Sequence, residues 1–259
     1  MPFADVHRQH IYFEDSGGDG PVVLFSHGFL MDNDMFDAQV AALSGEFRCI
    51  AWDQRGFGQT EATADFTFWD SADDALALLS HLGVEQAFFV GMSQGGFISL
   101  RAALRAPERV LGLGLIDTQS GEEPAEALPV YDAMTEEWTT NGPSDDLAAA
   151  VASIILGDCD VAPWIAKWQA SPKENIATPY RTLTSREDIS DRLPEITAPA
   201  IIFHGEVDAA IPMTRAEQLL AELPNAEELV RIPGAGHASN YSHPDAVNGP
   251  LAAFLRKHA

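Results

Sequence analysis

The chain has 259 residues, with 46% hydrophobic and 21% charged, proportions that suit one globular core and exclude wholesale disorder. The 39 acidic and 15 basic residues give a net charge of −24, which repels phosphate backbones and anionic lipid and argues against nucleic-acid and membrane partners. No apolar run approaches the roughly 20 residues of a membrane helix, and the N-terminus shows no signal-peptide pattern. We therefore expect a cytoplasmic protein.

Short β-like runs alternate with helical patterns along the chain, which predicts an α/β protein built on a mostly parallel sheet. Several runs, such as VVLF and AFFV, are apolar throughout, as in central strands that helices cover on both faces. The predicted strands are residues 9–14, 22–26, 48–52, 86–90, 111–116, 200–204 and 228–232. Apolar stripes and terminating residues predict helices over residues 70–81, 94–106 and 213–223.

The alternation stops for about 80 residues before the strand at 200–204, which is far longer than an ordinary connection. Helical patterns fill this stretch, at residues 125–140, 143–156, 161–170 and 174–184. Such an excursion from a sheet often forms a lid over a site, although a second layer of core packing is the alternative. We expect a core of residues 1–118 and 194–259 and a helical cap of residues 119–193. The cap's apolar Trp138, Trp164 and Trp168 are candidate walls of a substrate pocket.

The strongest chemical signal is the sequence GMSQG at residues 91–95, which has the form Gly-x-Ser-x-Gly. It lies directly after a predicted strand and directly before a predicted helix. A sharp turn there strains the serine backbone, and flanking glycines let strand and helix approach without a Cβ clash. The turn exposes the hydroxyl of Ser93, which is the candidate nucleophile.

A serine nucleophile needs a base to take its proton, and the base needs an acid to hold it. Of the eight histidines, His237 is the candidate base because its glycine-rich loop follows the last predicted strand, where catalytic groups of parallel sheets collect. Asp208, four residues after the strand at 200–204, is the candidate acid. Asp117, at the end of the preceding strand, is its rival.

A tetrahedral intermediate also needs two N–H donors aimed at its oxyanion. The backbone N–H of Gln94, at the start of a helix, is one candidate, and that of Phe29, in a loop after the strand at 22–26, is the other. The glycine-rich segment 53–60 lacks the spacing of a dinucleotide site and is interpreted as a structural turn. No pattern typical of a zinc or calcium site occurs, so we expect no metal.

Five segments together resemble the α/β-hydrolase superfamily over essentially the whole chain: HGF at 27–29, DQRGFGQT at 53–60, GMSQGG at 91–96, HGEVD at 204–208 and GAGH at 234–237. The resemblance implies eight strands, a helical cap inserted after the sixth, and no cofactor. A serine nucleophile departs from the epoxide-hydrolase and haloalkane-dehalogenase branches, which use aspartate. The five segments look most similar to those of small bacterial esterases, 3-oxoadipate enol-lactonases and cofactor-free perhydrolases.

These features predict a carboxylesterase-like serine hydrolase that cleaves a small to medium carboxylic ester or lactone through an acyl-enzyme. Two kinds of alternative stay open, because one fold supports several functions. The same triad could cleave carbon–carbon bonds or make peracids. The protein could also be a ligand sensor or signalling hydrolase with slow turnover.

Overall fold

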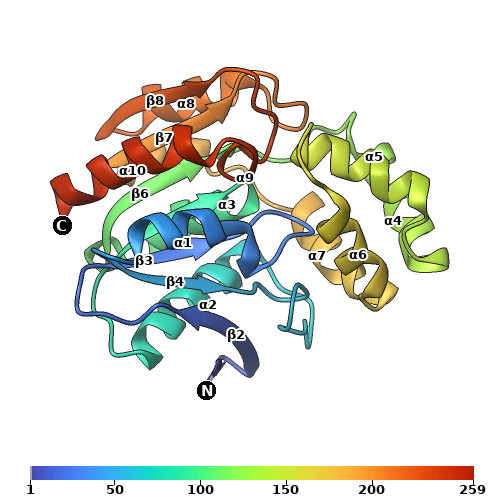
Figure 1. Ribbon diagram of the computed structural model, residues 1–259, viewed down its shortest axis with the longest axis horizontal. Coiled ribbons are helices and arrows are strands. Elements are labelled where there is room, and N and C mark those ends of the chain that lie inside the picture. Colours follow the sequence, from blue (N-terminus) through green and yellow to red (C-terminus); the bar gives the residue numbers. More distant parts are fainter. Residues whose placement is uncertain (1) are drawn as a thin grey trace.

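An eight-stranded sheet runs through the molecule in the order β1-β2-β4-β3-β5-β6-β7-β8 (Figure 1). The computed structural model describes residues 2–259. β1 and β2 are antiparallel to their neighbours, and the other six strands are parallel, which confirms the mostly parallel sheet. The strands are β1 (Phe3–Val6), β2 (Gln9–Asp15), β3 (Val22–Ser26), β4 (Arg48–Trp52), β5 (Ala87–Met92), β6 (Val110–Ile116), β7 (Ala200–Gly205) and β8 (Ala226–Ile232).

Helices cover both faces of this sheet, and the central strands β3, β5 and β7 are buried along their whole length. α1 (Asp37–Leu43) packs with α10 (Pro244–His258) on one face, and α2 (Phe68–His81) packs with α3 (Gln94–Arg105) on the other (Figure 1). α8 (Met213–Glu222) packs on β7 and β8. Burial on both faces explains why these strands are continuous apolar runs rather than alternating ones.

Four helices lie between β6 and β7: α4 (Leu128–Asn141), α5 (Asp145–Leu156), α6 (Ala162–Ala170) and α7 (Ala177–Thr184). Figure 1 shows them together at one end of the sheet, in yellow-green to gold. α6 is tied to the loop after β3, because the Trp168 indole N–H donates to the Leu30 carbonyl oxygen at 2.6 Å. Lys167 Nζ lies 2.7 Å from a carboxylate oxygen of Asp32 and 2.6 Å from one of Asp34.

β1 and α10 are among the elements that were not expected from the sequence, as is α1. β1 has only four residues and pairs antiparallel with β2 at the edge of the sheet, so its pattern is too short to stand out. α10 contains Pro250, which lacks an N–H and usually ends a helix. The helix continues because Val247, Leu251, Phe254 and Leu255 are buried against the sheet.

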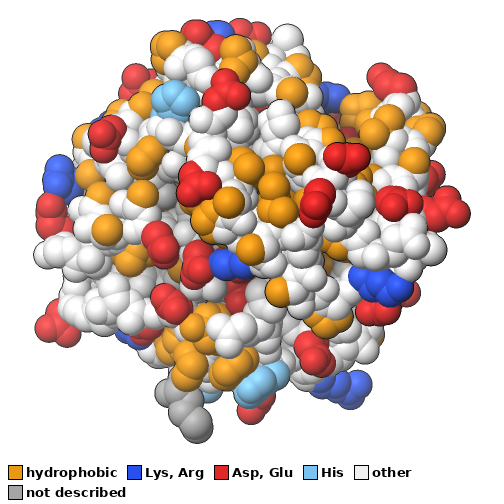
Figure 2. Space-filling model, turned by 45° about the vertical axis from the view of Figure 1, so that its right-hand side comes forward, with side chains coloured by type: hydrophobic (Ala, Val, Ile, Leu, Met, Phe, Trp, Pro, Cys, Tyr) orange, Lys and Arg blue, Asp and Glu red, His pale blue; other side chains and the backbone are white. Residues whose placement is uncertain are grey.

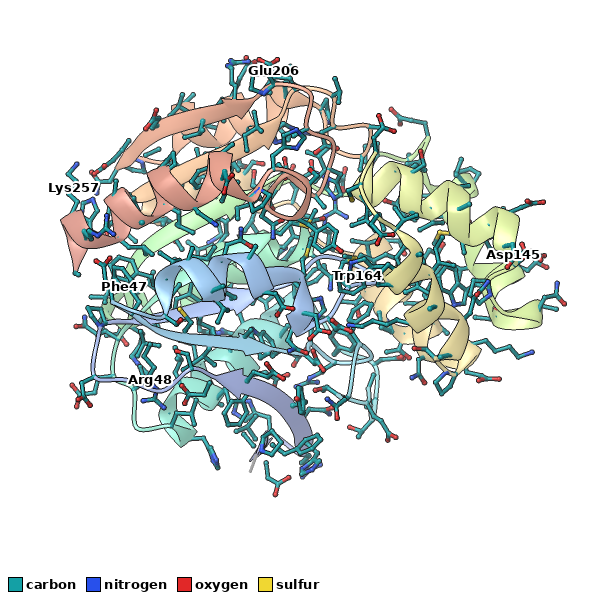
Figure 3. All side chains as sticks on the ribbon, in the orientation of Figure 1. Phe47, Arg48, Asp145, Trp164, Glu206 and Lys257 are labelled. Atoms are coloured by element: carbon teal, nitrogen blue, oxygen red, sulfur yellow. The ribbon has the colours of Figure 1, made fainter. Side chains whose placement is uncertain are left out.

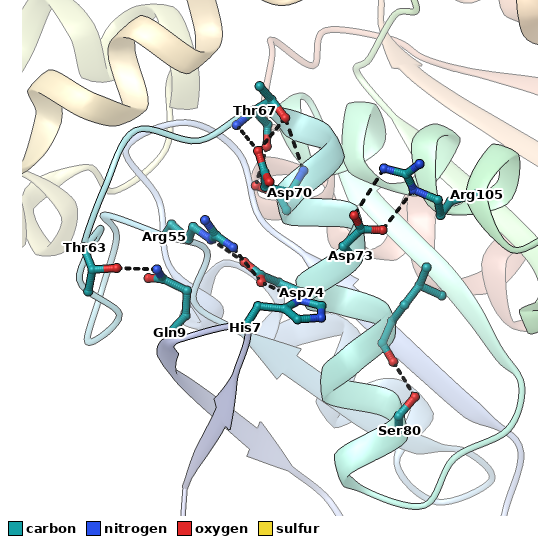
Figure 4. Close-up of polar contacts among 12 residues, drawn as sticks. His7, Gln9, Arg55, Thr63, Thr67, Asp70, Asp73, Asp74, Ser80 and Arg105 are labelled. Atoms are coloured by element: carbon teal, nitrogen blue, oxygen red, sulfur yellow. Dashed lines mark hydrogen bonds and ion pairs between the residues drawn. The ribbon is translucent and has the colours of Figure 1, made fainter.

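The glycine-rich segment 53–60 is held by buried carboxylates. Asp53 accepts backbone N–H groups from Asn33 and Gln59, both at 2.8 Å. Arg55 makes two hydrogen bonds to Asp74 of α2, at 2.5 and 2.8 Å (Figure 4). These contacts join the loops after β3 and β4 to α2, which is the structural role predicted for the segment.

Within the described residues, no helix is both long enough and apolar enough to cross a membrane.

Candidate active site

Ser93 lies at the sharp turn between β5 and α3, with a φ of +52° that is strained for a residue with a side chain. The glycines around it are required by close backbone approaches. A Cβ on Gly91 would lie 2.2 Å from a backbone atom of Gly95, and a Cβ on Gly95 would lie 1.8 Å from the carbonyl oxygen of Ser26. The Gly-x-Ser-x-Gly pattern therefore holds the serine where strand, helix and the neighbouring strand β3 meet.

His237 and Asp208 are brought together by the loops that follow β8 and β7. Asp208 Oδ2 lies 2.9 Å from His237 Nδ1, and Asp208 Oδ1 accepts the backbone N–H groups of Ala210 at 2.8 Å and Ile211 at 2.9 Å. One carboxylate oxygen thus fixes the acid in its own loop, and the other faces the imidazole. This division leaves His237 Nε2 as the nitrogen that can act as a base.

The two members of this pair shift each other's pKa in the directions expected of an ion pair. Burial alone would lower the pKa of His237, but the charge and hydrogen bond of Asp208 outweigh burial and raise it above the ordinary histidine value. Burial alone would raise the pKa of Asp208, but the charge and hydrogen bond of His237 and two backbone N–H groups hold it below its usual range. Asp208 is therefore charged at neutral pH.

The rival acid, Asp117, has a different set of contacts. Its Oδ1 accepts the Gly205 N–H at 2.8 Å, and its Oδ2 accepts the Ser239 N–H at 2.9 Å. Burial, and then the charge of Asp208, raise the pKa of Asp117 to about 7. Asp117 therefore joins the two loops that carry Asp208 and His237, and it is Asp208 that bonds to the imidazole.

The two predicted oxyanion donors lie on segments that a hydrogen-bond network joins. Gln94 Nε2 donates to Gln54 Oε1 at 2.7 Å, and Gln54 Nε2 donates to the His27 carbonyl oxygen at 2.6 Å. Burial lowers the pKa of His27 to about 4, so His27 is neutral and its Nε2 accepts the Gln54 N–H at 3.0 Å. This network holds the loop of Phe29 beside the turn of Ser93.

Ser93 and His237 line one cavity of about 290 Å³, together with Phe29. The cavity thus places the candidate nucleophile and the candidate base in one shared space. The other lining residues are mostly apolar side chains from the helices between β6 and β7: Val130, Tyr131, Met134, Val151, Ile154, Ile155 and Leu183.

Two of the lining residues, Val130 and Ile154, are also exposed at the surface, at 71% and 48%. Figure 2 turns this side of the molecule forward and shows hydrophobic side chains gathered among acidic ones. An apolar cavity with a few polar groups is the usual form of a small-molecule site.

The three tryptophans expected to line the substrate pocket do not line the cavity of Ser93. Trp138, Trp164 and Trp168 line a second cavity, of about 530 Å³, which does not include Ser93. All three are nearly buried, and Trp164 lies between α6 and the core in Figure 3. Trp138 packs on Trp168, with ring centroids 6.0 Å apart, and Trp168 bonds to the Leu30 carbonyl. Their apolar area holds helices together, as in the alternative interpretation of core packing.

Three side chains lie close enough together to be considered as ligands of a metal ion. Atoms of Asp117, His204 and Asp208 lie within 4.8 Å of one another. Hydrogen bonds already engage these groups, because both Asp117 oxygens accept backbone N–H groups and His204 Nε2 lies 2.9 Å from the Ile211 carbonyl oxygen. The geometry favours a set of hydrogen-bonded side chains that hold the loops of Asp208 and His237 together, rather than a metal site.

Sequence reasoning missed the polar part of the cavity, which Gln119, Glu123 and Arg186 supply. Gln119 and Glu123 lie in the segment after β6, and Arg186 follows α7. Each is unremarkable in a sequence, where a charged residue is ordinarily read as exposed. Only the fold shows that the Arg186 side chain is 1% exposed.

Comparison with known proteins gives consistent results over most of the chain. Residues 21–155 match the family model described as "alpha/beta hydrolase fold", and residues 165–258 match one described as "TAP-like protein". A bifunctional esterase/perhydrolase from Acinetobacter calcoaceticus is 28% identical, with 95% of this chain and 97% of that protein covered.

Two solved structures are also similar. The enol-lactonase from Burkholderia xenovorans has a TM-score of 0.90 at 26% identity, with 98% of this chain and 100% of that chain covered. A thermophilic esterase from Thermogutta terrifontis has a TM-score of 0.87 at 29% identity, with 97% and 95% covered. The chain belongs to the α/β-hydrolase family. The predicted family and the eight-stranded, mostly parallel sheet are thereby confirmed.

Proposed function

We propose that this α/β hydrolase is a serine esterase or lactonase that cleaves small to medium carboxylic esters through an acyl-enzyme. The observation that carries the proposal is the bond of 2.9 Å between Asp208 and His237 beside a cavity that His237 shares with Ser93. Relatives named as an esterase/perhydrolase, an enol-lactonase and an esterase support the same reaction class.

In the proposed reaction, His237 Nε2 takes the proton of the Ser93 hydroxyl as its oxygen attacks the ester carbonyl. The N–H groups of Phe29 and Gln94 stabilise the negative oxygen of the tetrahedral intermediate. Protonated His237 then gives its proton to the leaving alcohol. Water, activated by the same nitrogen, releases the acid from Ser93 and restores the free enzyme.

The cavity supports the size limit in this proposal. A volume of about 290 Å³ is at the small end of ligand sites, which usually range from about 300 to 1,000 Å³. Each buried methylene adds about 0.8 kcal/mol of binding until the wall is full, after which overpacking reverses the gain. We therefore expect kcat/KM to peak at short to medium acyl chains.

The test combines covalent labelling with turnover. A fluorophosphonate should add its mass to Ser93, and Ser93→Ala should lose labelling and reduce ester turnover by about 10⁴-fold or more, because triad members act as a unit. Ser153→Ala, which changes an exposed serine of α5, is the matched control and should keep both.

Labelling at another serine, or full turnover by Ser93→Ala, would refute the nucleophile assignment. Labelling of Ser93 with ester turnover far below about 1 s⁻¹ would instead favour the alternative of a sensor or a different reaction, such as carbon–carbon cleavage. Peracid formation from acetate and hydrogen peroxide, measured in the same preparation, tests the perhydrolase alternative.

A further inference from the structure

Four side chains of the cavity form what we call the polar corner: Gln119, Glu123, Tyr131 and Arg186. They lie in a wall that is otherwise apolar, and they are not part of the proposed triad or oxyanion hole. Burying polar groups is unfavourable unless their hydrogen bonds are satisfied. The question is therefore which groups in this corner lack a partner.

Arg186 is held firmly by the protein on two of its three nitrogens. Its Nε donates to the Gly121 carbonyl oxygen at 2.9 Å, and its Nη1 donates to Glu123 Oε2 at 2.6 Å and to the Leu183 carbonyl oxygen at 2.9 Å. Its guanidinium carbon lies 4.5 Å from the centre of the Phe97 ring, so one face of the group is covered. These contacts fix the guanidinium in one orientation.

The third nitrogen, Arg186 Nη2, is buried and has no hydrogen-bond partner within residues 2–259. The same is true of the Gln119 side-chain oxygen in the same corner. A fixed guanidinium with an unused pair of N–H donors, on a residue that lines the cavity, is arranged to receive an oxygen of a bound molecule.

Charge decides which kind of oxygen fits. The Glu123 carboxylate already neutralises Arg186 at 2.6 Å, and its side chain is only 10% exposed. The charged carboxylate of Asp208 lies behind His237, which lines the same cavity. A second carboxylate brought by a substrate would be repelled by both groups in a poorly solvated space, whereas a neutral carbonyl or ether oxygen would not.

We propose that Arg186 Nη2 donates a hydrogen bond to a neutral oxygen of the substrate, so the preferred substrates are uncharged esters or lactones with a second carbonyl or ether oxygen. This inference rests on the proposed esterase function and narrows its substrate class. Arg186 is then a specificity-determining residue and has no part in the bond-breaking step. Its removal is expected to change the choice among substrates more than the rate with a plain ester.

The experiment compares three sets of ethyl esters by kcat/KM, with product acids measured by chromatography. The plain set is ethyl pentanoate, hexanoate and heptanoate. The keto set places a ketone at C4, C5 or C6 of the same chains, and the charged set is the monoethyl esters of succinate, glutarate and adipate. In the wild type, at least one keto ester should exceed its plain counterpart about tenfold or more, as a hydrogen bond to a charged donor allows. The charged esters should be the poorest.

Arg186→Lys is the central variant, since it keeps a cation beside Glu123 but loses Nη2. It should bring the ratio of keto to plain ester down to about one, through a lower kcat/KM for the keto ester. Glu123→Gln is the second variant, and it leaves the guanidinium intact but not neutralised. It should keep the keto preference and raise the activity on charged esters relative to wild type.

The results separate this inference from the function on which it rests. No turnover of any plain ester by the wild type would defeat the proposed function itself. Turnover of plain esters with no keto preference, or with a keto preference that survives in Arg186→Lys, would overturn the role of Arg186. A preference for the charged esters in the wild type would overturn the choice of a neutral oxygen. If Arg186→Lys fails to fold, Glu123→Gln still tests the charge argument, and charged-ester activity no higher than in the wild type would overturn it.

Discussion

Replacing each of the two buried aspartates by asparagine should give opposite results, because their oxygens are used differently. In Asp208→Asn, the remaining oxygen can still accept the two N–H groups of its own loop, as Oδ1 does now. The new amide then faces His237 Nδ1 as a donor. The imidazole must accept there, so its proton moves to Nε2 and the nitrogen that faces the cavity can no longer act as a base.

In Asp117→Asn, by contrast, both oxygens are now engaged by backbone N–H groups, from Gly205 and Ser239. The amide would place a donor against one of these donors. Leaving a buried donor without an acceptor costs about 1–3 kcal/mol, and about 2–4 °C of melting temperature per kcal/mol is typical of chains near this size. We expect Asp117→Asn to melt several degrees lower but to keep the tautomer of His237.

The measurements are kcat with a short-chain ester and the melting temperature of both variants beside the wild type. Asp208→Asn should lose about 10⁴-fold in kcat with little loss of stability. Asp117→Asn should lose stability and at most modest activity. If Asp117→Asn were the more damaging to kcat while still folded, the assignment of the acid to Asp208 would be wrong.

Three further predictions follow from the site. The kcat/KM of ester hydrolysis should fall on acidification, because only the neutral imidazole of His237 is a base. The midpoint should lie above about pH 6.5, since Asp208 raises the pKa of His237. A midpoint well below this value would contradict the pairing of His237 with Asp208. Gly95→Ala should prevent folding or sharply lower the melting temperature, since its Cβ would lie 1.8 Å from the Ser26 oxygen. Gly45→Ala, with no atom within 4 Å among the described residues, should cost far less, and equal melting temperatures would refute the close approach. Ile154→Trp should lower kcat/KM for heptanoate more than for acetate esters by filling the cavity, and an unchanged chain-length profile would show that Ile154 does not limit it.

The parts of the fold that the sequence predicts are those in which local pattern and tertiary role agree. β3 and β5 are wholly apolar because both faces are covered, so their pattern and their position at the centre of the sheet give the same answer. α10 is the opposite case, since Pro250 is unfavourable locally and burial of the helix overrides it.

The residues of the candidate site also fall into two groups: those that the sequence suggests and those that only the fold brings together. Ser93, Asp208 and His237 lie at the ends of strands, so chain order and turn chemistry are enough to suggest them. Arg186 and Glu123 come from segments 63 residues apart, and their pairing depends on how the intervening helices fold back. The cavity that the tryptophans line could not be predicted for a related reason, because apolar area alone does not say which of two cavities a helix faces.

The bond between the Trp168 indole and the Leu30 carbonyl has a consequence for the proposed oxyanion hole. Leu30 has a φ of +64° and directly follows Phe29, whose N–H is a proposed oxyanion donor. Removing the indole N–H would leave the Leu30 carbonyl without this partner. A side chain that lines the other cavity would then act on turnover from a distance, through the position of a backbone donor.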